Sequence, residues 1–260
     1  MQLDREQVRR LVETTGGWPA AISLAAQSLR TVNDPDEFLA RFVATDRLVV
    51  DYLTEELLDT LSADHRRFLR DTSVVEDLVP DLAATLSDQT DAAEIADDLE
   101  RRGLLRRTYE GDRLYFRFHQ LLRDALYQGL DPEHRRTRHV AAADWYLATG
   151  QPRSAIDQLI GAGETDRAAT LIASHAGSYL LRGRYRTVEG WVATIGEQQR
   201  LAPGLSLIGA LASLYAGRVG QAAAWHLAAV DTDGELEPPD QLLALAIETM
   251  LQLAAGRTSD

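Results

Sequence analysis

Three glycines divide the second half of this 260-residue chain into nearly equal lengths. Gly150, Gly183 and Gly217 follow one another at intervals of 33 and 34 residues. Each is followed five residues later by a small or β-branched apolar residue, namely Ala155, Val188 or Ala222. A fixed period of this length is typical of arrays in which each unit packs only on its neighbours, so this half of the chain is expected to be a stack of similar units.

A period near 34 residues predicts tetratricopeptide-like pairs of antiparallel helices. We expect the small residues to lie where two helices cross, because a glycine or alanine there lets the helices approach closely. A fourth unit would begin near Gln241, with Gly256 placed 39 residues after Gly217. Because such a unit would be incomplete, we expect the chain to be a piece of a longer protein.

The first half of the chain shows helix start signals at irregular intervals. Asp4 with Gln7, and Asp91 with Glu94, are spaced as capping boxes, Ser62 is placed as an N-cap, and Pro80 as a first helical residue. Further helices are expected over 21–29, from Asp34 onward and over 49–61. These signals predict a mainly helical fold.

The apolar period changes after Gly103. Leu114, Phe116 and Phe118 alternate with other residues behind Glu110-Gly111-Asp112, which predicts a β-hairpin. Three short helices, a hairpin and a further helix follow the order of a winged helix. We therefore expect a helical subdomain at 1–60, a winged-helix domain at 61–131 and helical repeats at 132–260.

Composition excludes several kinds of chemistry. The formal charge of −13 repels phosphate backbones, and the absence of cysteine rules out disulfides, thiolate metal sites and cysteine nucleophiles. All 27 basic residues are arginine, so a P-loop, which needs a lysine, cannot form from this chain. The charged N-terminus does not resemble a signal peptide, and the uncharged stretch 201–217 is interpreted as a buried helix. We expect a cytoplasmic protein that does not bind membranes.

Three blocks together resemble one family. They read VETTGGWPAAISLAA, RRFLRDTSVVEDLVPDLAATL and RLYFRFHQLLRDAL, in that order. They resemble the MalT-like, ATP-dependent LuxR-type transcriptional regulators, a class of signalling ATPases. In that family a P-loop ATPase core precedes a helical subdomain, a winged helix and a tetratricopeptide-like arm that receives an effector, and a DNA-binding helix-turn-helix ends the protein. The resemblance implies that this chain matches the middle parts.

The resemblance implies a role for Pro19 in the Gly-Gly-Trp-Pro turn. In related ATPases a proline in such a turn packs against the nucleotide base. A proline at a first helical position does present an apolar ring with a fixed backbone angle. The plainer interpretation is a helix-breaking turn with Trp18 in the core.

His119 is the second residue to which the resemblance gives a role. FHQLLRDAL is similar to a stretch in which a histidine donates a hydrogen bond to the diphosphate of bound ADP. An imidazole at a helix N-terminus adds a donor beside free backbone N–H groups, which suits an anion. Gln120 stands where relatives often have aspartate. No cofactor is expected for this chain alone, whereas ATP or ADP is implied for the intact protein.

Two other groups of residues are candidate binding surfaces. Arginines 106, 107, 113 and 117 lie on the hairpin, yet the helix before it carries Glu94, Asp97, Asp98 and Glu100. We expect these arginines to pair with carboxylates, and the winged helix to pack against protein rather than DNA. The repeat aromatics are expected to be mainly core residues, some of which could line an effector site: Trp145, Tyr146, Tyr179, Tyr185, Trp191, Tyr215 and Trp225.

The sequence favours a regulatory segment over an enzyme. Its partners would be the P-loop ATPase core and a small-molecule or protein effector on the repeats, with no direct nucleic acid contact. Effector binding would shift the nucleotide state. The alternative is a free-standing helical-repeat adaptor that binds a protein or peptide. The absence of an ATPase motif from this chain favours that alternative.

Overall fold

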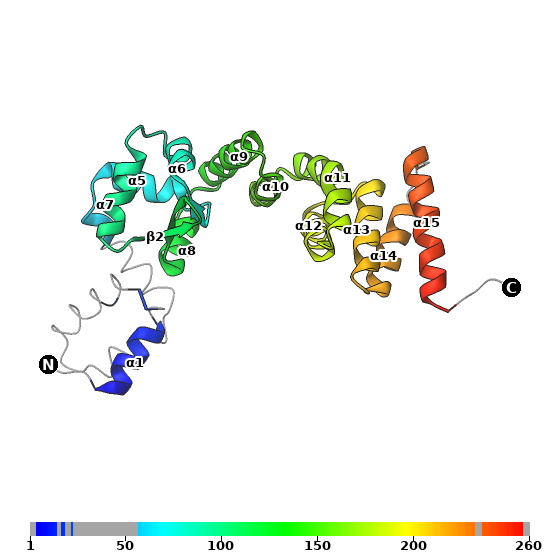
Figure 1. Ribbon diagram of the computed structural model, residues 1–260, viewed down its shortest axis with the longest axis horizontal. Helices are drawn as coiled ribbons and strands as arrows, with labels where there is room; N and C mark the ends of the chain where they lie inside the picture. Colours follow the sequence, from blue (N-terminus) through cyan, green and yellow to red (C-terminus); the bar gives the residue numbers. More distant parts are fainter. Residues whose placement is uncertain (1–3, 15–16, 19–21, 23–56, 232–235, 257–260) are drawn as a thin grey trace. The chain divides into compact units, whose positions relative to one another are not determined.

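The computed structural model describes residues 4–14, 17–18, 22, 57–231 and 236–256. The helices expected over 21–29 and from Asp34 onward, and most of the one expected over 49–61, lie outside these residues. Two compact units divide the chain, Met1–Ala142 and Ala143–Asp260. The boundaries expected after residues 60 and 131 remain predictions. The described part is mainly α-helical with one small sheet, as the sequence predicts (Figure 1).

The first unit contains helices and three strands. In chain order these are α1 (Arg5–Thr14), α5 (Ala63–Thr72), β1 (Asp77–Leu78), α6 (Pro80–Ser87), α7 (Ala92–Arg101), β2 (Leu105–Glu110), β3 (Arg113–Phe118) and α8 (Gln120–Gln128). Helix α9 (Pro132–Ala148) contributes residues to both units.

Most of the predicted helix starts are confirmed. Asp4 and Gln7 exchange side-chain-to-backbone hydrogen bonds of 3.0 and 2.8 Å at the start of α1. The Ser62 hydroxyl accepts a bond from the backbone N–H of His65, and Pro80 is the first residue of α6. Helix α7 begins at Ala92 as predicted, but the capping box of Asp91 and Glu94 is wrong. The backbone of Asp91 has φ −96° and ψ 18°, away from the extended conformation of a capping residue, and its side chain makes no capping bond.

The predicted hairpin is confirmed and belongs to a larger sheet. β2 and β3 pair antiparallel from Leu105 opposite Phe118 to Glu110 opposite Arg113. β1 pairs with the other edge of β3, giving the order β1-β3-β2. A strand of two residues has no alternation to detect, so the sequence did not reveal it. β2 packs on α7, and α5 packs on α6, α7 and α8. The core of this unit includes Phe68, Leu69, Leu78, Leu82, Leu86, Leu99 and Phe116.

The second unit continues as helix pairs joined by short turns. These helices are α10 (Pro152–Gly161), α11 (Thr165–Leu181), α12 (Tyr185–Gln198), α13 (Pro203–Tyr215), α14 (Val219–Val230) and α15 (Pro238–Ala254). Helix α13 packs against α12, α14 and α15, so consecutive helices stack on one another (Figure 1). The array of helix pairs predicted from the 34-residue period is confirmed.

The periodic glycines serve a different purpose from the one predicted. Gly150, Gly183 and Gly217 lie in the turns between paired helices, with φ between 72° and 77°. A Cβ at Gly150 or Gly217 would meet no heavy atom within 4 Å. The glycines are therefore required by the left-handed backbone of the turn rather than by a close helix approach. The small residues that follow them, including Ala155 and Ala222, are fully buried.

Close approach is found instead at Gly209, inside α13. A Cβ there would lie 2.6 Å from Trp225 Cε3 and 2.8 Å from Val192 Cγ1. Gly209 thus allows α13 to pack closely on both α12 and α14. Trp225 packs against two clusters of buried apolar residues, one centred on α11 and α12 and the other on α13 and α15.

Candidate functional site

The structure brings Trp18, of the Gly-Gly-Trp-Pro motif, into contact with His119. The rings of Trp18 and His119 are stacked, with centroids 5.5 Å apart and planes inclined by 12°. Trp18 is 1% exposed, and its indole N–H donates to the backbone carbonyl of Gly103 at 3.3 Å. The interpretation of Trp18 as a core residue is confirmed. Its stacking on a histidine 101 positions away could not be read from either motif alone.

His119 occupies the corner at which β3 turns into α8. It is the N-cap of α8, with extended backbone angles of −68° and 134°, and it is half-buried. The first turn of α8 holds no acidic residue. The helix is fixed in place by the buried Leu122 and by Arg123, whose Nε donates to the carbonyl of Ser73 at 3.1 Å. The predicted hairpin-to-helix corner is confirmed.

This corner has the chemistry of an anion site. Helix N-termini present unpaired backbone N–H groups and a partial positive charge, and the imidazole adds a side chain that can donate. No carboxylate stands in the first turn of α8. An anionic group at this corner would therefore meet no like charge from the first turn of α8. Pro19, the other predicted nucleotide contact, lies outside the described residues, although its neighbour Trp18 packs on His119.

Two hairpin arginines are engaged within the winged helix. Arg107 lies 2.5 Å from Asp97 of α7, and its guanidinium stands over the Phe116 ring at 5.6 Å. Arg117 donates to Asp77 and also lies 2.8 Å from Glu110. The hydrogen bond from Arg117 to Asp77 raises the pKa of this guanidinium. The predicted pairing with carboxylates is confirmed for these two arginines.

Asp98 of α7 is also paired with arginines, whereas two arginines of the hairpin are not. Asp98 accepts hydrogen bonds from Arg102 at 2.6 Å and from Arg101 at 3.0 Å. The hydrogen bond from Arg102 lowers the pKa of Asp98. Arg106 and Arg113 are exposed, and neither forms an ion pair with the part of the chain that the structure describes. The positive charge left on the hairpin is therefore small.

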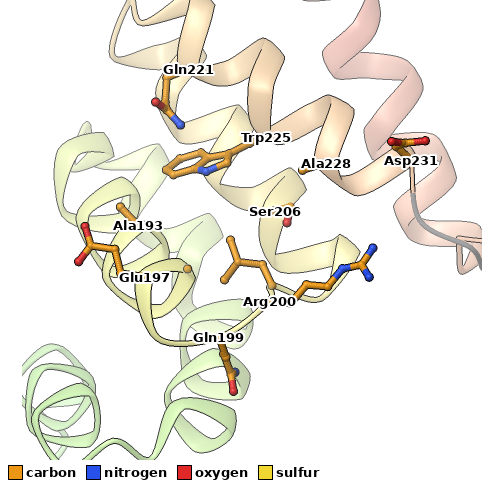
Figure 2. Close-up of a pocket in the computed structure, with 11 residues that line it drawn as sticks. Ala193, Glu197, Gln199, Arg200, Ser206, Gln221, Trp225, Ala228 and Asp231 are labelled. Carbon is orange, nitrogen blue, oxygen red and sulfur yellow. The ribbon is translucent and has the colours of Figure 1, made fainter.

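A pocket of about 480 Å³ opens in the helical arm between α12, α13 and α14. Figure 2 shows the ring of Trp225, on α14, facing the segment that joins α12 to α13. The lining combines this aromatic face with charges of both signs: Glu197, Arg200 and Asp231. Gln199, Ser206 and Gln221 add neutral polar groups. Such a mixture suits a polar organic molecule better than a purely apolar one.

The repeat aromatics divide between core and surface. Trp191 is 5% exposed, its indole N–H donates to Asp157 at 2.6 Å, and Tyr179 meets it edge-on. The core interpretation is thus confirmed for Trp191. Trp225 instead lines the pocket, and Tyr215 is 50% exposed. Which aromatics face outward depends on how the helices cross, so their spacing alone could not identify them.

Within the described residues, no group of histidines and carboxylates is arranged to hold a metal ion. None of the described helices is long and apolar enough to cross a lipid bilayer.

Comparison with known proteins matches part of the first unit to a family. The MalT winged helix domain family matches residues 54–138. The serine/threonine-protein kinase PknK of Mycobacterium tuberculosis H37Rv is 34% identical over 175 residues, which cover 66% of this chain and 16% of PknK. The HTH-type transcriptional regulators MalT of Yersinia enterocolitica and Klebsiella pneumoniae are 29% and 27% identical over 179 residues, covering 67% of this chain and 20% of each regulator.

The chain therefore spans between a sixth and a fifth of the length of these curated relatives. The matched winged helix contains the three helices, the sheet and the His119 corner described above. The predicted resemblance to MalT-like regulators is confirmed, and residues 54–138 belong to the MalT winged helix domain family.

Proposed function

We propose that this segment is the regulatory part of an ATP-dependent transcriptional regulator, in which effector binding to the helical arm controls the nucleotide state of an ATPase core. The observation that carries the proposal is the stacking of Trp18 on His119. This contact joins Trp18 of the Gly-Gly-Trp-Pro motif to His119 of the winged helix. Both motifs are expected to contact the nucleotide. The segment performs no catalysis itself and acts in the cytoplasm.

In the resting state of this switch, His119 donates a hydrogen bond to the diphosphate of ADP held by the core. The N-terminal N–H groups of α8 add to the attraction, and the Trp18 ring limits the rotation of the imidazole by covering one of its faces. The nucleotide supplies negative charge, while this chain supplies the donor and its orientation. Loss of that contact would favour the open, ATP-bound form.

The arm is proposed to receive the effector in the pocket beside Trp225. An aromatic wall and both signs of charge allow a small polar ligand to be oriented as well as bound. The lining comes from α12, α13 and α14, so an occupant would fix how these helices pack. A change in that packing is a physical means by which effector binding could bias the rest of the protein.

The test uses this segment joined to a P-loop ATPase core, with ADP affinity measured by titration. His119→Ala is expected to weaken ADP binding by roughly 10-fold or more, because a hydrogen bond to a charged group contributes about 1.5–3 kcal/mol. His119→Asn retains a side-chain N–H donor and should recover part of the loss. His175→Ala, a half-buried histidine of the arm, serves as the control.

Unchanged ADP affinity in His119→Ala would refute the sensor role. The chain without a core is expected to bind ADP negligibly, since one histidine and one proline make too few contacts without the amides that cradle phosphates.

A further inference from the structure

An exposed aromatic and basic surface lies where two turns of the arm meet. The rings of Tyr185 and Tyr215 stack at 5.2 Å with an interplanar angle of 25°, joining the start of α12 to the end of α13. Leu181, at the end of α11, is 91% exposed. Arg182 and Arg184 lie in the turn that follows, Arg186 is the second residue of α12, and all three are exposed. We call these six residues the tyrosine–arginine surface.

The charge of this surface is opposite to that of the chain. No acidic residue occurs between Asp166 and Glu189, although the whole chain carries a formal charge of −13. Glu189 is buried and is already engaged, because Arg218 and the Ser213 hydroxyl both donate to it at 2.6 Å. It is therefore not available to neutralise the three arginines.

The three arginines also differ from most others in the described residues. Several arginines elsewhere in the described residues are held by carboxylates, as Arg107 is by Asp97 and Arg167 is by Asp144. None of Arg182, Arg184 and Arg186 forms an ion pair within the described part of the chain. Solvated arginines beside an apolar side chain keep their full capacity to bind carboxylates.

We propose that the tyrosine–arginine surface docks an acidic peptide segment of a partner protein, one that carries an apolar side chain among its carboxylates. The carboxylates pair with the arginines, and the apolar side chain covers Leu181 and the edge of the stacked tyrosines. Tyrosine and arginine, with tryptophan, are enriched among the residues that contribute most to binding at protein interfaces.

Charge and stacking favour a peptide over a nucleic acid. The two tyrosine rings already stack on each other, so each has one face less for a base. The net charge of −13 opposes a long polyanion more strongly than a short peptide. The surface is separate from the pocket beside Trp225, and the proposal does not depend on the proposed function.

The test measures fluorescence anisotropy of the full chain with a labelled dodecapeptide that contains two leucines among aspartates and glutamates. Binding in the micromolar range is expected at low salt, weakening as sodium chloride rises because exposed charges are screened. Arg184→Gln and Leu181→Ser should each weaken binding by about 5- to 10-fold. Both side chains are exposed, so neither change should affect folding.

Arg167→Gln removes the same charge elsewhere in the arm and should leave binding unchanged. Three results would overturn the proposal. One is the absence of binding to the acidic dodecapeptide. Another is equal weakening by Arg167→Gln and Arg184→Gln, which indicates general attraction between opposite charges. The third is tighter binding of a thymidine dodecanucleotide than of the peptide.

Discussion

Replacing Gly209 by alanine tests how closely the helices of the arm are packed. The added methyl would lie 2.6 Å from Trp225 Cε3, whereas ordinary contacts of a Cβ begin near 3.4 Å. The indole or the helix must therefore move by roughly 0.8 Å, the difference between these distances. Trp225 packs against apolar residues of two clusters, so its ring has little room to give way.

Two effects of opposite sign decide the outcome for Gly209→Ala. Alanine is favoured over glycine inside a helix by about 1 kcal/mol. Overpacking a well-packed site costs about 1–3 kcal/mol. The net change should be a loss of stability of up to about 2 kcal/mol, because the contact is with a large, constrained ring.

Gly190→Ala is the matched control for this substitution. Gly190 lies inside α12, and a Cβ there would meet no heavy atom within 4 Å. This variant should gain up to about 1 kcal/mol from helix propensity alone. The difference between the two variants cancels the propensity and isolates the overpacking cost of about 1–3 kcal/mol.

Urea denaturation of the full chain, followed by far-UV circular dichroism, measures both free energies of unfolding. Tryptophan fluorescence reports in addition whether the surroundings of Trp225 change. Equal stabilities for Gly209→Ala and Gly190→Ala would refute the packing argument, because they would mean that the indole moves aside without cost.

Two further predictions concern the first unit. The hydrogen bond from Arg102 lowers the pKa of Asp98, so an NMR titration of its carboxyl carbon should give a midpoint below the ordinary 3.8, and Arg102→Gln should raise it. The stability that this pair contributes is fully present above the unfolded-state pKa of Asp98 and is lost as the pH falls through its lowered folded-state pKa. A titration midpoint at or above 3.8 would contradict the hydrogen bond from Arg102 to Asp98. Trp18→Ala removes a buried ring and its bond to Gly103, and it should lower the free energy of unfolding by about 3–5 kcal/mol. A loss below about 1 kcal/mol in urea denaturation would mean that Trp18 is not a core residue.

Several parts of the fold could be predicted from the sequence because their signals are local. The caps at Asp4 and Ser62 depend on residues three positions apart, and the hairpin depends on alternation along two short strands. The 34-residue period predicted the helix pairs of the arm without any knowledge of their packing. His119 was expected at a strand-to-helix corner for the same reason, since both neighbouring elements are visible in its flanking residues.

The contacts that make a site were decided only by the tertiary structure. The stacking of Trp18 on His119, the addition of β1 to the hairpin and the pocket beside Trp225 join residues that are far apart in the chain or belong to different elements. The turn glycines were found by their period, but their backbone angles revealed their purpose, and the close approach proved to be at Gly209. A sequence pattern predicts the backbone conformation of a segment and which of its faces is buried against other apolar residues. Which neighbour it meets depends on how the helices cross.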